Sequence, residues 1–305
     1  MIHGTHNAIE DSRNKEVLIY VNGEFYPRNE AKISVFDSGY LVGDGIWEGI
    51  RMHRGKLVFI EDHMDRLFRA SKATGIALGK TPEEFIELLQ EVCRVNNMDD
   101  GIHLRLMITR GIKKTPSQDP RLTISGPNIV VIAEHKHASK ESKQKGISLF
   151  TSTIRRGSPD YLDPRLNCHS KLHEVQALIQ ALEAGADEAL MLDVNGFVST
   201  CNATNFFMVK NDEVWTSTGE YCMNGITRKK VIEACVANGI ICRQKNFSLY
   251  DVYDADEAFV TGTFGGLTPV QTIDGRKIGT QQMGNKTSIL DRLYDQLITD
   301  YVNKN

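Results

Sequence analysis

Residues 185–207 have the sequence GADEALMLDVNGFVSTCNATNFF, and this stretch bears most directly on the fold. The apolar run EALML predicts a buried strand, and NFFMV, which begins at Asn205, predicts another. Between them, the Asn195–Gly196 pair is a strong turn signal. The second half of the chain is therefore expected to contain a sheet.

Outward from this stretch, expected helices and strands alternate irregularly in both halves of the chain. A hairpin is predicted at residues 17–27 around Asn22–Gly23, and strands at 103–111 and 129–135. Helices are predicted at 61–75, at 82–96, at about 170–183, and from Ile226 to Asn238–Gly239. The helix at 170–183 has one apolar face, made of Leu172, Val175, Leu178, Ile179 and Leu182. This order predicts a mixed α/β (α+β) architecture rather than a doubly wound sheet.

A polar segment divides the chain into two parts. Residues 136–146, KHASKESKQKG, are rich in lysine and end in glycine, so they are expected to form a solvated linker rather than a basic binding patch. The predicted domains are a smaller α/β domain at residues 1–135 and a larger α/β domain at 147–305. A chain of 305 residues is long enough for two such domains.

Composition argues against several classes of function. The net charge of -3 gives no electrostatic case for nucleic acid. No apolar run approaches the ~20 residues of a membrane helix, and the N-terminus carries no signal-peptide core, so a cytoplasmic location is expected. The six cysteines form no CxxC pair, which predicts reduced thiols and no metal site.

Three short segments could together hold a phosphate. NGITR (224–228) predicts a helix start whose free N–H groups and Thr227 hydroxyl could face an anion. TGTFGG (261–266) offers the Thr263 hydroxyl and glycines that allow close backbone approach. Arg66 could supply a charged fork. Taken singly, each segment is better explained as a threonine cap, a glycine-rich turn or a surface arginine.

Jointly and in order, these segments resemble the class IV pyridoxal-phosphate-dependent aminotransferases, which include branched-chain and D-amino acid aminotransferases and aminodeoxychorismate lyase. The resemblance also rests on GYLVGDGIWEGIR (39–51), EDHMDRL (61–67) and GADEA (185–189), and it extends from about residue 18 to 295. It implies the two-domain fold-type-IV architecture, a homodimer, and pyridoxal phosphate between the domains. It assigns cofactor binding to Arg66, Thr200, Gly225, Ile226, Thr227, Gly262 and Thr263, of which Arg66, Ile226, Thr227 and Thr263 would hold the phosphate. It assigns the substrate side to Trp47, Glu48, Arg51 and Arg105.

Two positions depart from the family pattern. Where relatives have the lysine that binds the cofactor covalently, this chain has Asn167, and an amide cannot form an imine. Where relatives have the glutamate that keeps the pyridine nitrogen protonated, this chain has Thr200, whose hydroxyl would leave the ring neutral. Lys171, at the start of a predicted helix, is the candidate substitute for the lysine.

These departures leave three hypotheses open. The first is an enzyme that uses pyridoxal phosphate or its amine form, without the usual covalent tether or with Lys171, on an amino acid or small amine. The second is a non-catalytic binding or regulatory protein that keeps the phosphate site. The third is a lyase-type or other enzyme that reuses the same residues for a different phosphorylated ligand.

Overall fold

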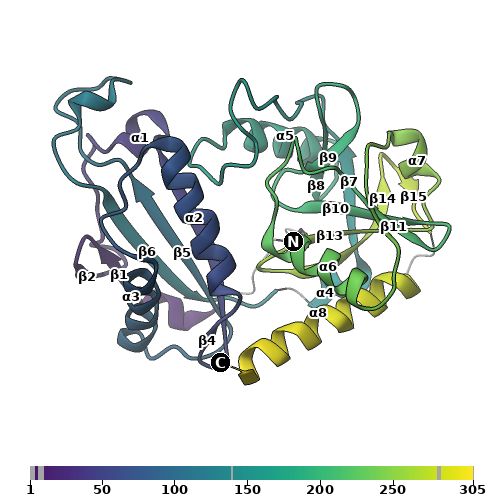
Figure 1. The fold of residues 1–305 in the computed structure, drawn as a ribbon, viewed down its shortest axis with the longest axis horizontal. Coiled ribbons are helices and arrows are strands. Elements are labelled where there is room, and N and C mark those ends of the chain that lie inside the picture. The colour runs from purple at the N-terminus through teal and green to yellow at the C-terminus, as the bar shows by residue number, and fades with distance from the viewer. Residues whose placement is uncertain (1–3, 6–9, 139, 280–282, 305) are drawn as a thin grey trace. The chain divides into compact units, whose positions relative to one another are not determined.

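The computed structural model describes residues 4–5, 10–138, 140–279 and 283–304, and the chain divides into two compact units (Figure 1). Unit 1 comprises Met1–Ile9, Ala138–Arg165 and Leu172–Asp300. Unit 2 comprises Glu10–His137, Leu166–Lys171 and Tyr301–Asn305. Each unit is therefore built from segments that are separated in the sequence.

Unit 2 is built on an antiparallel sheet of six strands, with the order β2-β1-β6-β5-β3-β4 within the described residues. The strands are β1 (Leu18–Val21), β2 (Glu24–Pro27), β3 (Gly45–His53), β4 (Lys56–Leu57), β5 (Ile102–Thr109) and β6 (Asn128–His135). The helices are η1 (Ser12–Lys15), α1 (Ser38–Val42), α2 (Ile60–Thr74), α3 (Pro82–Val95) and η2 (Pro120–Leu122).

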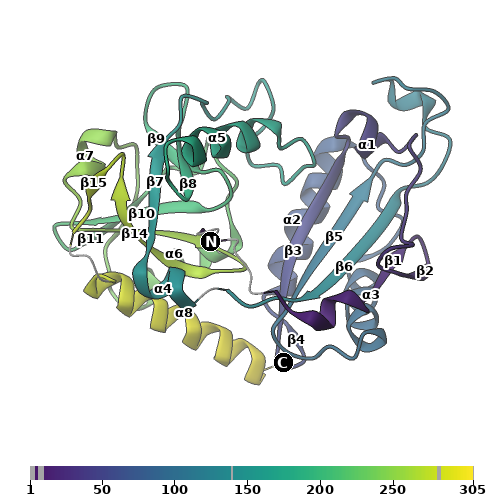
Figure 2. The ribbon, with the colours of Figure 1, turned by 180° about the vertical axis from the view of Figure 1, so that it is seen from behind.

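Helices α2 and α3 cover one face of this sheet, as Figure 2 shows from behind. Because side chains alternate along a strand, Ile46, Ile50 and Leu104 point to the same face and join the core. From the helices, Leu67 and Phe85 complete that core. Helix α3 starts in a capping box, in which Thr81 and Glu84 satisfy each other's backbone N–H groups.

Unit 1 is built on a mixed sheet whose main path is β12-β11-β10-β13-β14-β7-β8-β9, with β15 paired to β14. Its strands are β7 (Ile147–Thr151), β8 (Glu188–Leu192), β9 (Val198–Cys201), β10 (Asn205–Lys210), β11 (Glu213–Thr216), β12 (Cys242–Gln244), β13 (Glu257–Gly262), β14 (Gly266–Ile273) and β15 (Arg276–Lys277). Its helices are α4 (Lys140–Lys145), α5 (Leu172–Glu183), α6 (Ile226–Ala237), α7 (Leu249–Tyr253) and α8 (Asn285–Lys304), the last of which ends in residues assigned to unit 2. No helix in the described parts of the chain is long and apolar enough to cross a membrane.

The expected mixed α/β fold is confirmed, and the structure adds detail that the sequence did not indicate. The hairpin at 17–27 is found as β1 and β2, with Asn22 and Gly23 at positive φ in the turn. The segment at 136–146 is less open than a solvated linker, because residues 140–145 form α4 against β14 and Ser142 is buried. Residue 139 of that segment lies outside the described residues, and the domain boundaries of 1–135 and 147–305 stay a prediction.

Helix α5 packs against the sheet with a face other than the one that carries its large apolar side chains. Ala177 and Ala181 are buried against Ala189 and Met191 of β8. The larger apolar side chains of Leu172, Val175, Ile179 and Leu182 are exposed. The apolar face of this helix is therefore its outer face in the single chain.

Candidate functional site

Strand β3 and helix α2 bring Arg66, Glu48 and His63 together inside unit 2. Arg66 donates through Nε and Nη2 to the two Glu48 oxygens, at 2.8 and 2.7 Å. His63 Nδ1 lies 2.7 Å from Glu48 Oε2 and donates to it. The side chains of Glu48 and His63 are 0% and 1% exposed. His63 and Arg66 can share this carboxylate because residues three apart lie on one face of a helix.

The charges of this cluster follow from its contacts. Burial raises the pKa of Glu48, but the Arg66 charge and the hydrogen bonds from Arg66 and His63 together hold it below its usual value. Burial lowers the pKa of His63 and outweighs the nearby carboxylate. The cluster therefore contains one carboxylate, one guanidinium and a neutral imidazole.

Arg66 has one nitrogen to spare. Its Nη1 atom is buried and has no hydrogen-bond partner within the described part of the chain. An unpaired buried donor costs about 1–3 kcal/mol, and a charged donor costs more. Since Glu48 fixes the other two nitrogens, the guanidinium presents this donor in a set direction, as an anion-binding arginine must.

In unit 1, the N-terminus of α6 is suited to an anion. The cap residue Gly225 provides no side-chain hydrogen bond, so the first-turn N–H groups of Ile226 and Thr227 lack a side-chain cap. A Cβ at Gly225 would clash with Asn205 Oδ1, which explains the glycine. The Thr227 hydroxyl is buried and lies 3.3 Å from the Tyr294 hydroxyl.

The second predicted phosphate segment follows β13 in the same unit. Gly262 pairs with Gly266 across the β13–β14 turn, and both Gly262 and Thr263 are half-buried. The hydroxyl of Thr261, on β13, is buried without a partner in the described structure. This turn therefore offers threonine hydroxyls beside glycines that would allow a ligand to approach the backbone.

Asn167 lies in an extended segment that joins unit 2 beside β3. Trp47 N–H donates to the Asn167 carbonyl at 3.0 Å, and Asn167 Nδ2 donates to the Trp47 carbonyl at 2.7 Å. The side chain is buried, and its Oδ1 atom has no partner among the described residues. A Cβ at Gly45 would lie 2.7 Å from His169 Nδ1, so glycine at Gly45 makes room for the same segment. Lys171 ends the segment, directly before α5, and is half-buried.

Thr200 lies on β9 in unit 1, opposite Met191 of β8. Its hydroxyl donates to the Thr204 carbonyl at 2.7 Å and lies 3.3 Å from Asn205 Nδ2. Asn205 also accepts from the Gly225 N–H at 3.2 Å. One asparagine therefore connects Thr200 with the start of α6.

The predicted substrate-side residues fall on opposite faces of the unit 2 sheet. In the β3–β5 register, Gly49 faces Arg105 and Arg51 faces His103, so the odd-numbered residues share one face with Trp47. On that face the Arg105 guanidinium lies 4.0 Å from the centre of the Trp47 ring. Glu48 points to the other face, toward α2, where Arg66 and His63 engage both of its oxygens. The structure therefore groups Glu48 with Arg66 and not with the other three.

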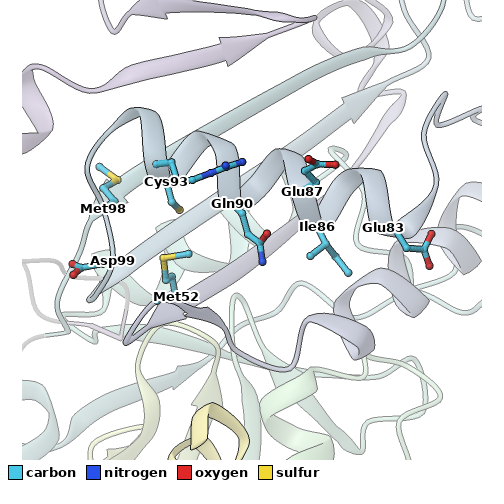
Figure 3. Close-up of a pocket in the computed structure, with 10 residues that line it drawn as sticks. Met52, Glu83, Ile86, Glu87, Gln90, Cys93, Met98 and Asp99 are labelled. Atoms are coloured by element: carbon cyan, nitrogen blue, oxygen red, sulfur yellow. The ribbon is translucent and has the colours of Figure 1, made fainter. Parts of the chain in front are cut away.

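Two cavities of unit 2 differ in their relation to these residues. One, of about 390 Å³, lies on the face of Arg105, and the cations among its described lining residues are Arg28, Lys32, Arg105 and Lys136. His103 and the acid Glu134 also line it. The other, of about 640 Å³, runs along α3 between Glu83 and Met98 (Figure 3). None of the predicted site residues lines the second cavity, so we relate only the first to function.

Two residues of these clusters were not predicted from the sequence. His63 precedes Arg66 by three residues, and that helical spacing was a usable signal. Asn205 opens the NFF strand, and nothing in the sequence indicated that its amide would contact both Thr200 and Gly225. Such a contact depends on the pairing of strands that are not neighbours in the chain.

With this geometry established, comparison with known proteins identifies the family. A model of the amino-transferase class IV family matches residues 45–273. The branched-chain-amino-acid aminotransferase-like protein 2 of Arabidopsis thaliana is 41% identical over 284 residues, 93% of this chain and 51% of that protein. The putative branched-chain-amino-acid aminotransferase of Methanocaldococcus jannaschii is 38% identical over 93% of this chain and 97% of that protein. The chain spans about half the length of the two Arabidopsis relatives that it matches.

The fold is also that of solved aminotransferases. The branched-chain amino acid aminotransferase of Escherichia coli aligns with a TM-score of 0.86 and 26% identity, over 94% of this chain and 96% of that one. A second solved branched-chain amino acid aminotransferase, with pyridoxamine 5′-phosphate, aligns with a TM-score of 0.87 and 29% identity, over 94% of this chain and 95% of that one. The two sheets and their helices are thus a fold-type-IV aminotransferase architecture. Because the family model covers most of the sequence, this chain belongs to the class IV aminotransferase family and is branched-chain aminotransferase-like.

Proposed function

We propose that this chain binds pyridoxal 5′-phosphate, or its amine form, and acts on an amino acid or a small amine. The observation that supports this proposal most directly is the Nη1 atom of Arg66, which is buried and has no hydrogen-bond partner among the described residues. The other two guanidinium nitrogens are held by Glu48. Arg66, Gly225, Ile226, Thr227, Gly262 and Thr263 would hold the phosphate. These donors fit a phosphate because charge-assisted hydrogen bonds and helix N-termini are what such a dianion binds best.

The residues at the two chemical positions do not fit the usual reaction. When bound, pyridoxal phosphate supplies an electron sink, and in relatives a lysine amine and a carboxylate support it. We propose that Asn167 and Thr200 occupy those two positions here. The Asn167 amide cannot bond to the aldehyde and is already engaged with Trp47, and Thr200 donates its hydroxyl to a carbonyl. Efficient standard transamination is therefore not expected, and Lys171 is the candidate amine.

For the substrate, we propose an amino acid whose carboxylate binds on the Arg105 face of unit 2. The cavity there carries several cationic groups, and burial lowers the pKa of Arg105 without neutralising it. The names of the relatives point to branched-chain amino acids and to D-alanine. Arg51 and Trp47 lie on the same face and would border such a ligand.

An absorption scan of the purified protein, followed by borohydride reduction and peptide mapping, tests this proposal. Bound cofactor that is released on denaturation, with no reduced adduct, supports untethered binding. An adduct on Lys171 shows that the covalent lysine has moved four residues along the chain. Failure to bind either cofactor form at micromolar concentration contradicts the proposal.

The second candidate is a non-catalytic binding or regulatory protein on the same fold, and the Asn167 amide favours it. It predicts cofactor binding with no half-reaction on any amino acid. A lyase-type enzyme would instead release a non-amine product from the substrate. Product analysis after single-turnover incubation with pyridoxal phosphate and a panel of amino acids separates these outcomes.

We also propose that the protein is a homodimer, as relatives of this family imply. The exposed apolar face of α5, made of Leu172, Val175, Ile179 and Leu182, supports self-association in unit 1. In unit 2, a second exposed apolar group surrounds α1, and it consists of Ile33, Val35, Phe36, Tyr40 and Val42.

A further inference from the structure

Helix α6 and strand β12 turn one cysteine each toward the other in unit 1. On α6, Arg228 and Cys235 are seven residues apart and share a face, and both are buried. On β12, Cys242 and Gln244 are two residues apart and also share a face. Arg228 Nη2 donates to Gln244 Oε1 at 3.1 Å, so these two faces oppose each other. Cys235 and Cys242 therefore meet across the same contact.

The chain between the two cysteines closes this arrangement. After α6 ends, the Ile240 N–H returns to the Cys235 carbonyl at 2.9 Å. The next residue accepts a hydrogen bond from Val214, which places Cys242 in register beside β11. Helix α6 also packs directly against β12, so the two thiols lie on facing surfaces.

The two thiols are unequal. Of the six cysteines, all within the described residues, Cys242 alone is not buried. The neighbouring Cys235 thiol and the Arg228 charge lower the pKa of Cys242, although burial opposes them. The neighbouring Cys242, together with burial, raises the pKa of Cys235. Cys242 is thus the less buried residue of the pair and the one whose pKa is lowered, whereas Cys235 is fully buried and its pKa is raised.

We propose that Cys235 and Cys242 form a reversible disulfide when the protein meets a peroxide, with Cys242 oxidised first. This arrangement has the three features of a redox-sensitive site, which are an accessible thiol, a nearby cation and a resolving cysteine. The proposal rests on unit 1 alone and does not depend on the cofactor or on the reaction proposed above.

The chemistry balances in two steps. The Cys242 thiolate attacks one oxygen of hydrogen peroxide, the O–O bond breaks, and the departing hydroxide takes up a proton to become water, which leaves a sulfenic acid. The Cys235 sulfur then attacks the Cys242 sulfur, the S–O bond breaks, and the hydroxyl leaves as water with the Cys235 proton. Two thiols are oxidised by two electrons, and one peroxide is reduced to two waters.

The other cysteines lack this combination. Burial raises the pKa of Cys93 to about 12, and it also raises that of Cys201. Cys222 is fully buried and has Ser217 and Asn205 as its sulfur contacts. Cys168 is buried beside β3 in unit 2.

The test is peptide mapping of the folded protein after brief exposure to hydrogen peroxide and alkylation of the remaining thiols. The expected result is the loss of two thiols per chain and a 235–242 cross-link that dithiothreitol reverses. Oxidation of Cys93 or Cys201 before Cys242, or a link between Cys242 and Cys222, would overturn the proposal.

Single variants assign the order of the steps. In Cys235→Ser, oxidation of Cys242 is expected to stop at the sulfenic acid, which a 1,3-diketone then traps. The rate of this trapping should lie within threefold of the rate at which Cys242 is oxidised in the wild type. In Cys242→Ser, Cys235 is expected to stay reduced. The matched control Cys93→Ser should form the cross-link like the wild type. If Cys242→Ser loses its Cys235 thiol at the wild-type rate, Cys242 is not the first target and the proposal fails.

Discussion

Arg66 is the residue on which the proposed phosphate site depends, and its role is inseparable from that of Glu48. The carboxylate holds two guanidinium nitrogens and receives a third hydrogen bond from His63. Removing one partner of a buried ion pair leaves an uncompensated charge, at about 3–5 kcal/mol. Substitutions at Arg66 therefore change both ligand binding and the stability of unit 2, and experiments must separate these effects.

The first prediction uses Arg66→Ala and Arg66→Lys. Arg66→Ala should weaken pyridoxal phosphate binding by ~1.5–3 kcal/mol, because a charge-assisted contact to a dianion is lost. Arg66→Lys keeps the charge but not the fork, and should fall between alanine and wild type. Thr227→Ala and Thr263→Ala should cost less, ~0.5–1.5 kcal/mol each. Calorimetric titration with pyridoxal phosphate gives these values. It is done at a temperature at which urea unfolding curves show that every variant is folded.

Equal affinity in Arg66→Ala and wild type would show that Arg66 does not contact the phosphate. The Glu48→Gln variant is a control for positioning. This variant keeps Arg66 but removes the carboxylate charge that fixes its position, so the affinity for pyridoxal phosphate should fall. That affinity should still depend on salt concentration, because the Arg66 charge remains.

The second prediction concerns acid. The pKa of Glu48 in the folded chain lies below its usual value of 4.5. The stability that ionised Glu48 contributes to folding is therefore present above that pH and is lost as the pH falls below it. The pKa of His63 lies below 6.5, so the unfolded chain takes up this proton first and folding also weakens as pH falls from 6.5. The free energy of unfolding in urea should therefore decrease from pH 7 to pH 4. His63→Gln keeps a donor for Glu48 and should flatten the part between pH 7 and 5, and an unchanged slope would contradict the neutral imidazole.

The third prediction concerns Asn167 and Thr200. Asn167→Lys should place an amine at the cofactor aldehyde and yield a borohydride-reducible adduct at residue 167. Burial should lower the pKa of that amine and favour its neutral, nucleophilic form. Thr200→Glu should then favour the protonated pyridine, and only the double variant should gain appreciable half-transamination with a simple amino acid. Bound cofactor without an adduct in Asn167→Lys would show that residue 167 does not face the aldehyde.

At the scale of the site, the sequence was informative where spacing along one element decides position. Arg66, Ile226 and Thr227 could be proposed because a helix and a helix start fix them locally. Glu48 could have been separated from Trp47 and Arg51 by strand alternation alone, since 48 is even. The contacts of Asn205 and the pairing of Asn167 with Trp47 could not be predicted, because they join segments distant in sequence.

Helix α5 shows the limit of pattern at the scale of an element. The 3.6-residue periodicity correctly predicted a helix with an apolar stripe along one face. The structure instead buries Ala177 and Ala181 against β8, where small side chains allow the helix to approach closely. Periodicity cannot distinguish a face that meets the sheet from a face that meets another partner.

The fourth prediction tests this packing. Ala177 is 0% exposed, so Ala177→Leu should overpack the contact with β8 and destabilise the protein by ~1–3 kcal/mol. Val175→Ala, on the exposed face of the same helix, should change the stability of the monomeric chain by no more than ~0.5 kcal/mol. Urea unfolding of both variants at low protein concentration gives the two values. A larger loss for Val175→Ala would mean that the outer face is packed within the chain.

At the scale of the whole molecule, composition could not predict which segments of the chain belong to which of the two units. The sequence predicted a linker at residues 136–146, and the structure adds that residues 166–171, well beyond that linker, belong to unit 2, whereas Thr5 belongs to unit 1. The first assignment follows from hydrogen bonds between the Asn167–His169 segment and β3. In unit 1, Thr5 N–H donates to the buried carboxylate of Glu188 at 2.9 Å. The unit to which such a segment belongs depends on hydrogen bonds to distant parts of the chain, and the composition of a linker gives no information about these.

The last prediction is that the protein is a homodimer that uses the exposed face of α5. Two-fold symmetry would place each substitution in the interface twice, so Val175→Lys with Ile179→Lys would bring four like charges together. Burying unpaired charges costs several kcal/mol, so dimer affinity should fall by on the order of 100-fold or more. Val236→Lys is the matched control, because Val236 is exposed on α6 and outside the α5 face. Sedimentation at micromolar concentration should show dimers for wild type and Val236→Lys, and folded monomers for the double variant. A wild-type monomer with bound cofactor would contradict the homodimer, and a dimeric double variant would exclude the α5 face as its interface.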